Sequence, residues 1–189
     1  MDDGPFEIAL VGDLSEHEAD LAGKLLEVPP GGECTLYFDS PGGSQYSGTS
    51  LMSLILVRGL QATGIVTGEC SSAALWPLAA CTRRIVTPYS VLLFHPLKWQ
   101  SDENVGLDEA KEWARHFGTL ETEMDSVLAQ LFNIPDAELA EWMRPGRYVS
   151  GRELAAAGLA ELVELRDMGR LMTNGRAPSK KRSKARLAT

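Results

Sequence analysis

The chain has 189 residues, 44% of them hydrophobic, which is enough for one buried core but leaves no room for a separate regulatory domain. Residues 1–167 carry 26 acidic and 11 basic groups, whereas residues 168–189 carry seven basic and no acidic ones. The acidic body argues against nucleic-acid binding, and the chain has neither a membrane-length apolar run nor the basic start of a secretion signal. We therefore predict a cytoplasmic protein with one domain, residues 1–167, and a basic, disordered tail over residues 168–189.

The first half of the chain predicts alternating strands and helices. The predicted strands cover residues 6–11, 34–38, 63–67, 84–86 and 91–94, and the predicted helices cover residues 15–26, a segment around 51–56 and residues 72–80. Ser15 to Glu18 has the pattern of a capping box at the start of the first helix. Repeated βαβ units of this kind predict an α/β fold with a largely parallel sheet, which binds ligands at the carboxyl ends of its strands.

The second half of the chain is mainly helical. A long helix is predicted over residues 108–131, and its apolar stripe is compatible either with a neighbouring subunit or with core packing. Shorter helices are predicted from Pro135 to Trp142 and from a capping box at Ser150 to Gly158. Residues 162–165 are expected to end the fold.

Ser72 and His95 are the residues that most clearly indicate chemistry. Ser72 lies where a β-branched run gives way to small residues, and His95 ends a buried strand. A histidine can activate a serine hydroxyl without a metal. His17 and His116 lie on amphipathic helices, so His95 is the predicted base, and it also occupies the position that Lys98 would need in a Ser-Lys pair.

Cofactors are not expected from the sequence. Cys34, Cys70 and Cys81 form no CxxC pair, which argues against a disulfide framework and a zinc site and favours plain buried thiols. The chain has neither a phosphate-binding P-loop nor a metal-binding histidine cluster. Cys70 lies two residues from the serine, but serine is the better candidate nucleophile at a helix start.

Backbone donors for an oxyanion can be sought at the same strand ends. Gly42 and Gly43 allow close approach of a substrate, and the amide of Ala73 lies at a predicted helix start. An isolated Pro-Gly-Gly more often marks a turn. Here the motif supports an oxyanion hole because it is predicted to lie on the same face of the sheet as Ser72 and His95.

Four segments together resemble the ClpP family, the proteolytic subunit of the Clp protease. The resemblance covers about residues 7–165 and rests on residues 38–43, 68–74, 88–97 and 157–161. It implies the ClpP/crotonase fold with a protruding handle helix, and a serine endopeptidase that needs no cofactor. Carried over by position, it implies these roles: Ser72 as nucleophile, His95 as general base, Glu161 as triad acid, Gly43 and Ala73 as oxyanion donors, and Ser40 and Gly42 beside the bound peptide.

The chain departs from the family pattern at several positions. Glu161 stands where aspartate is usual, and Ala73 and Ala74 replace Met-Gly. Pro77 lies inside the helix predicted after Ser72, where a proline is tolerated in about the first turn but would kink the helix beyond it. The resemblance implies stacked homo-oligomeric rings that act on peptides or unfolded proteins. Family members that work with an unfolding ATPase carry a longer segment before the first strand, so we predict weak or absent coupling to a Clp-type ATPase.

Two other functions stay open. One is a ClpP-like structural or regulatory subunit that is catalytically weak or inactive, which Glu161 and the altered flank of Ser72 motivate. The other is an acyl-CoA enzyme of the related crotonase group, which uses a similar oxyanion hole but for which the chain is short.

Overall fold

The computed structural model describes residues 6–99 and 104–169, so nearly all of the predicted basic tail lies outside the described residues. The strands are β1 (Phe6–Asp13), β2 (Glu33–Gly42), β3 (Gln61–Cys70), β4 (Arg83–Val86), β5 (Val91–Phe94), β6 (Arg147–Ser150) and β7 (Glu161–Leu162). The helices are α1 (Leu14–Glu27), α2 (Gln45–Val57), α3 (Leu75–Ala79), α4 (Leu107–Phe132), α5 (Asp136–Met143) and α6 (Gly151–Ala156), with 3₁₀ turns at Ser72–Ala74 and Leu165–Asp167.

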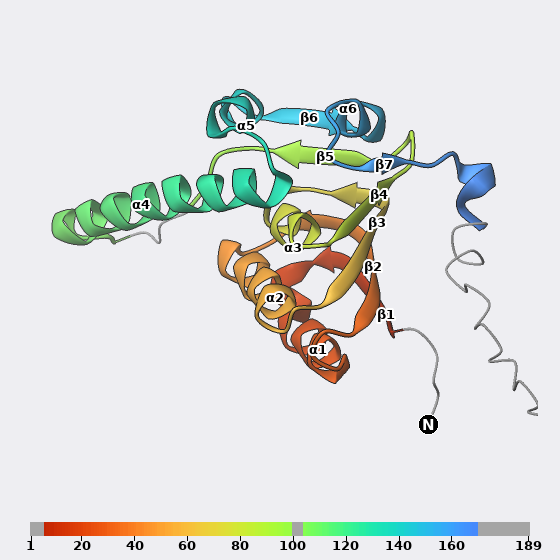
Figure 1. Cartoon of the computed structure of the whole chain (residues 1–189). Helices are drawn as coiled ribbons and strands as arrows, with labels where there is room; N and C mark the ends of the chain where they lie inside the picture. Colours follow the sequence, from red (N-terminus) through yellow and green to blue (C-terminus); the bar gives the residue numbers. More distant parts are fainter. Residues whose placement is uncertain (1–5, 100–103, 170–189) are drawn as a thin grey trace, which may run out of the picture.

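The sheet is largely parallel, as predicted. Its main path runs β1-β2-β3-β4-β7, with every neighbouring pair parallel. β5 joins β3 through the pair Glu69 and Val91 and then pairs with β6 antiparallel. Figure 1 shows α1, α2 and α3 gathered on one side of the sheet, with β6, α5 and α6 at its other end. The predicted α/β class and βαβ order are confirmed.

The core lies between this sheet and the helices that cover it. Along β2 every second residue is buried, so Leu36 and Phe38 face the core while their neighbours are partly exposed. Leu51 and Ile55 of α2 are buried as well. Full burial of a side chain of this size contributes about 1.5–3 kcal/mol, so these residues anchor β2 and α2 in the core.

Two helix starts differ from the predictions. α1 begins at Leu14, and the Asp13 side chain accepts a hydrogen bond from the Ser15 amide, so the predicted capping box at Ser15 is wrong. A carboxylate two residues earlier caps the helix amides equally well. The predicted helix over 72–80 is divided into a 3₁₀ turn and α3. Pro77 therefore lies in the first turn of α3, the position in which a proline was expected to be tolerated, because its missing N–H needs no partner there.

α4 protrudes from the body of the protein, which confirms the predicted handle helix (Figure 1). Only Leu128, Ala129 and Phe132, in its last turns, are buried. The helix ends at Asn133, whose left-handed backbone conformation is a common helix terminator. No helix within the described ranges is long and apolar enough to cross a membrane.

Candidate active site

Ser72 and His95 lie side by side at the carboxyl ends of neighbouring strands. Ser72 opens the 3₁₀ turn just after β3, and His95 directly follows β5. Because Glu69 and Val91 pair in parallel, the chain segments that follow them leave the sheet at the same level. The Ser72 Oγ atom lies 2.8 Å from Nε2 of His95. The structure therefore brings the predicted nucleophile and the predicted base into hydrogen-bond contact.

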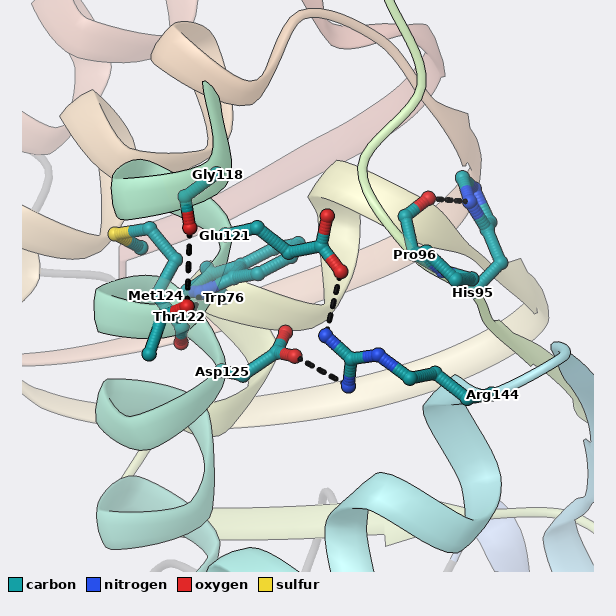
Figure 2. Close-up of polar contacts among 9 residues, drawn as sticks. All are labelled: Trp76, His95, Pro96, Gly118, Glu121, Thr122, Met124, Asp125 and Arg144. Atoms are coloured by element: carbon teal, nitrogen blue, oxygen red, sulfur yellow. Dashed lines mark hydrogen bonds and ion pairs between the residues drawn. The ribbon is translucent and has the colours of Figure 1, made fainter. Parts of the chain in front are cut away.

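The hydrogen bond that Nδ1 of His95 makes determines which of the two ring nitrogens carries the proton. Nδ1 lies 2.6 Å from the carbonyl oxygen of Pro96, and Figure 2 shows the imidazole turned toward that carbonyl. A carbonyl can only accept, so Nδ1 carries the proton in this contact. In the neutral ring Nε2 is then free to accept the proton of Ser72, which is the tautomer that a general base requires.

Ser71 holds Ser72 in an unusual backbone conformation. Ser72 has φ of 54°, in the left-handed region that non-glycine residues rarely adopt. The Ser71 amide donates to the Ser40 carbonyl at 3.0 Å, and the Ser71 hydroxyl accepts from the Leu93 amide at 3.1 Å. These contacts tie the turn to both β2 and β5. Such strain persists only where neighbours impose it. The sequence reasoning missed Ser71, whose signal is a small polar residue buried beside the candidate nucleophile.

Gly42 allows the two predicted oxyanion segments to pack together. A Cβ atom at Gly42 would lie 2.8 Å from Cβ of Ser72 and 2.9 Å from the amide nitrogen of Ala73, and its φ is 106°. Only glycine fits this position. Gly43 lines the cavity beside the serine, and a side chain there would collide with Asp13 and Ser15.

Ser40 does not face the cavity, contrary to its predicted contact with the peptide. Its side chain is fully buried, donates to the Gly12 carbonyl at 2.6 Å and accepts from the Gly42 amide at 3.1 Å. The alternation of β2 turns position 40 to the same side as Phe38, into the core. Ser40 therefore supports the turn at Gly42 from the core side, and Gly42 packs against Ser72.

Glu161, the expected triad acid, lies elsewhere in the sheet. It pairs with Ile85 of β4, which is level with Ile65 of β3, five residues before Cys70. At about 3.3 Å per residue, this offset places Glu161 some 16 Å short of the end of β3. Ser72 lies beyond that end of β3, so the main chain at position 161 is distant from Ser72.

The side chain of Glu161 also has another partner. Arg83 donates to both carboxylate oxygens, at 2.9 Å from Nε and 2.6 Å from a terminal nitrogen. This bidentate contact lowers the pKa of Glu161 and raises the pKa of Arg83. The expected Ser-His-Glu triad is therefore corrected: the structure assembles Ser72 and His95 without Glu161. The pairing register of a two-residue strand was not readable from the sequence.

In the described part of the chain, no carboxylate contacts the His95 imidazole. The segment between α5 and β6 passes His95 at Gly146, where a Cβ atom would lie 3.3 Å from Cβ of His95, so it presents no side chain to the ring. Glu121 and Asp125 of α4 line the same cavity, yet both bind Arg144, at 2.5 Å and 3.1 Å (Figure 2). Burial raises the pKa of Asp125, and the nearby guanidinium opposes this shift. The sequence reasoning missed this cluster, which has no local pattern.

A cavity of about 300 Å³ opens beside Ser72 and His95. Its apolar wall comes mainly from α3, α4 and the segment after β5, and consists of Trp76, Leu97, Phe117, Leu120, Met124 and Met143. The indole of Trp76 donates to the Met124 carbonyl at 3.3 Å, which fixes α3 against α4. An apolar hollow next to a few polar groups is typical of a site for organic ligands.

The described residues beside Ser72 form no metal-binding cluster and expose no thiol. Among the described residues, no three His, Cys, Asp or Glu side chains gather as a metal would require. Burial raises the pKa of Cys70 well above its ordinary value, and the thiol lies 3.3 Å from the Ala74 carbonyl, to which it donates. A buried thiol of this kind stays protonated and unreactive. The hydroxyl that contacts His95 is therefore that of Ser72, the predicted nucleophile.

Comparisons with known proteins agree with the geometry. A family model described as Clp protease matches residues 8–166. A search of curated proteins finds no match. Among solved structures, a variant of ClpP1 from Listeria monocytogenes aligns with a TM-score of 0.73 over 86% of this chain and 93% of that chain, with 18% sequence identity. At this identity the likeness establishes the shared fold.

Proposed function

Because the chain belongs to the Clp protease family, we propose that it is a serine peptidase in which Ser72 attacks the peptide bond and His95 transfers the proton. The observation that carries the proposal is the 2.8 Å contact between Ser72 Oγ and His95 Nε2, in the tautomer that the Pro96 carbonyl imposes. The apolar cavity beside the pair supports a peptide as the substrate.

The reaction would run in two halves. Ser72 Oγ bonds to the substrate carbonyl carbon while its proton passes to Nε2 of His95. The backbone amides of Gly43 and Ala73 are the proposed donors to the resulting oxyanion. The imidazolium then protonates the leaving amine as the C–N bond breaks, and water repeats the steps on the acyl-enzyme to release the acid and free Ser72.

The third member of this site is a main-chain carbonyl in place of a carboxylate. The Pro96 carbonyl orients the His95 ring and accepts from Nδ1, but it is neutral and stabilises the imidazolium less than an ionised acid would. We therefore propose a Ser-His pair that works more slowly than a complete triad. The catalytically weak subunit corresponds to the same geometry with a reaction rate close to zero.

We also propose that the protein forms a homo-oligomer through the handle. Most of α4 lies away from the core and carries aromatic side chains on its surface. Trp99 stacks on Phe117 and meets Trp113 edge-on, with ring centroids 5.8 Å and 5.6 Å apart, and remains 45% exposed. Trp99, exposed against the partly buried rings of Trp113 and Phe117 on the protruding helix, favours a contact with a further copy. Native mass spectrometry tests this part, and a stable monomer would contradict it.

The test of the activity is labelling by a fluorophosphonate probe on the assembled protein. We expect labelling at Ser72 that disappears in Ser72→Ala, because only an activated hydroxyl attacks the phosphorus. An assembled wild-type protein that takes up no probe would sink the peptidase proposal and favour the inactive subunit. Turnover of an enoyl-CoA that survives Ser72→Ala would favour the crotonase-type enzyme instead.

A further inference from the structure

The orientation of the His95 ring depends on one main-chain carbonyl. The ring torsion of a histidine has a broad energy profile, so the contacts at its ring nitrogens decide how the ring lies. Nε2 lies 2.8 Å from the Ser72 hydroxyl, which can donate or accept and therefore imposes no tautomer. Nδ1 lies 2.6 Å from the Pro96 carbonyl, which can only accept (Figure 2). A residue that holds this carbonyl in place therefore acts on His95.

The segment that carries the Pro96 carbonyl has no regular structure. Residues 95–99 follow β5 as neither helix nor strand. In the described part of the chain, no backbone–backbone hydrogen bond ties residues 96–99 to another segment. Lys98 is exposed, and Leu97 is partly buried at the cavity wall. Side-chain packing must therefore determine the path of this segment.

Trp99 attaches the segment to the handle helix α4. Its ring stacks on Phe117, with centroids 5.8 Å apart and planes inclined by 17°, and meets Trp113 edge-on at 5.6 Å. Both arrangements are among those that aromatic pairs prefer. Trp113 and Phe117 are four residues apart and so lie on the same side of α4. Because Trp99 is only three residues from Pro96, its attachment restricts where the Pro96 carbonyl can lie.

We propose that Trp99 is a positioning residue for the proposed peptidase reaction. By packing on α4 it holds the Pro96 carbonyl against Nδ1 of His95, and this contact leaves Nε2 free to accept the proton of Ser72. The proposal rests on the proposed peptidase function. It makes the orientation of the base depend on the handle helix. Trp99 also lines the cavity, so its test must separate positioning from substrate binding.

The tautomer of His95 tests the proposal without turnover. Magic-angle-spinning ¹⁵N NMR on protein labelled at the histidine nitrogens distinguishes protonated from unprotonated ring nitrogens, and His95→Gln identifies the signals of His95. In the neutral ring, Trp99→Ala should lower the ratio of Nδ1-protonated to Nε2-protonated form roughly tenfold, and Trp99→Phe, which can still stack, should restore it. Tyr89→Ala is the matched control, because Tyr89 is an exposed aromatic residue that does not line the cavity. A wild-type ratio in Trp99→Ala would overturn the proposal.

Turnover of p-nitrophenyl acetate separates positioning from binding. Its acetyl group brings no side chain to the apolar wall, so Trp99→Ala should lower kcat roughly tenfold and leave KM within about twofold. Trp99→Phe should recover most of the loss. A change in KM alone would show that Trp99 is only part of the wall and would contradict the inference. A changed tautomer in Trp99→Ala, together with a wild-type protein whose Ser72 takes up no fluorophosphonate, would overturn the peptidase function alone.

Assembly needs its own control, because Trp99 is also the proposed contact with a further copy. Leu107→Asp places a charge on an exposed position at the start of α4 and leaves the ring contacts of Trp99 in place. Native mass spectrometry reports the assembly of each variant. An unchanged His95 tautomer in dissociated Leu107→Asp would support the proposal. The same change of tautomer as in Trp99→Ala would show that assembly orients His95, and would overturn the role of Trp99.

Discussion

The two ends of the sheet hold their polar pairs in different ways. Beyond the carboxyl end of β3, Ser72 and His95 are only partly exposed and contact each other at 2.8 Å. Toward the other end, Glu161 and Arg83 form an ion pair whose side chains are 54% and 44% exposed. The first pair leaves a hydroxyl and a ring nitrogen directed at one another beside a cavity. The second pair occupies both carboxylate oxygens with a guanidinium in solvent, so it has no free group to offer the site.

The difference shows that proximity in this fold depends on strand pairing more than on the order of motifs. β3 and β5 pair near their carboxyl ends, which brings together residues 23 positions apart. β7 pairs with β4 at the edge of the main sheet, level with the middle of β3, so Glu161 follows the family motif in sequence but not the site in space. A substitution at either end should therefore reveal which pair serves catalysis.

His95→Gln is the substitution expected to have the largest effect. Glutamine can still hydrogen-bond to Ser72 but cannot take its proton at neutral pH, so the rate of fluorophosphonate labelling should fall by about 10²–10⁴-fold. The rate is measured by gel fluorescence at several probe concentrations. His17→Gln serves as the control, because His17 is exposed on α1. Labelling of His95→Gln at the wild-type rate would contradict the role of this base.

Gly42→Ala should have the next largest effect. The added methyl carbon would lie 2.8 Å from Cβ of Ser72 and 2.9 Å from the Ala73 amide nitrogen, at a φ of 106° that alanine rarely adopts. The serine turn must shift, and a displacement of this kind can cost about 10²-fold in rate. The thermal midpoint should fall as well, because the strain costs on the order of 1–3 kcal/mol.

The matched control is Gly23→Ala in α1, where the added methyl would meet no atom within 4 Å. Alanine favours the helix by about 0.5–1 kcal/mol over glycine, so this variant should unfold at a slightly higher temperature and keep its labelling rate. If Gly42→Ala behaved like Gly23→Ala, the close packing of the glycine turn against Ser72 would be refuted.

The sequence was enough to predict the parts of the molecule that local patterns determine. The strands that lead to Gly43, Ser72 and His95 contain short apolar runs that end in small or polar residues, so their positions and their common edge could be inferred. Helical periodicity located α4, whose protrusion followed from the family resemblance. These features depend on neighbours within a few residues.

The remaining errors come from contacts between distant segments. Asp13 replaced Ser15 as the cap of α1, and Ser40 turned into the core because of the alternation along β2. Glu161 was misplaced because nothing near it in the sequence reveals that β7 pairs with β4 or that Arg83 lies opposite. The second hydrogen-bond partner of His95 is the Pro96 main-chain carbonyl, which no residue type can signal.

Glu161→Gln is expected to have the smallest effect, and it separates the two ends of the sheet most directly. Because Glu161 bonds to Arg83 and not to His95, labelling of Ser72 should stay within about twofold of wild type. An exposed ion pair contributes about 0–1 kcal/mol, so the unfolding free energy should fall by no more than that. Arg83→Gln should give the same result. A loss of about 10²-fold or more in the labelling rate of Glu161→Gln alone would restore Glu161 to a catalytic triad.

The pH dependence of stability gives an independent check on the same pair. The contact with Arg83 lowers the pKa of Glu161 below its ordinary value of 4.5 in the folded protein. A carboxylate with a lowered folded pKa stabilises the protein above its unfolded pKa, and this contribution is lost as the pH falls through the folded pKa. Chemical denaturation should therefore separate wild type from Glu161→Gln above about pH 5 and bring the two curves together in acid. If Glu161 instead oriented His95, the two proteins would differ mainly in the pH profile of Ser72 labelling.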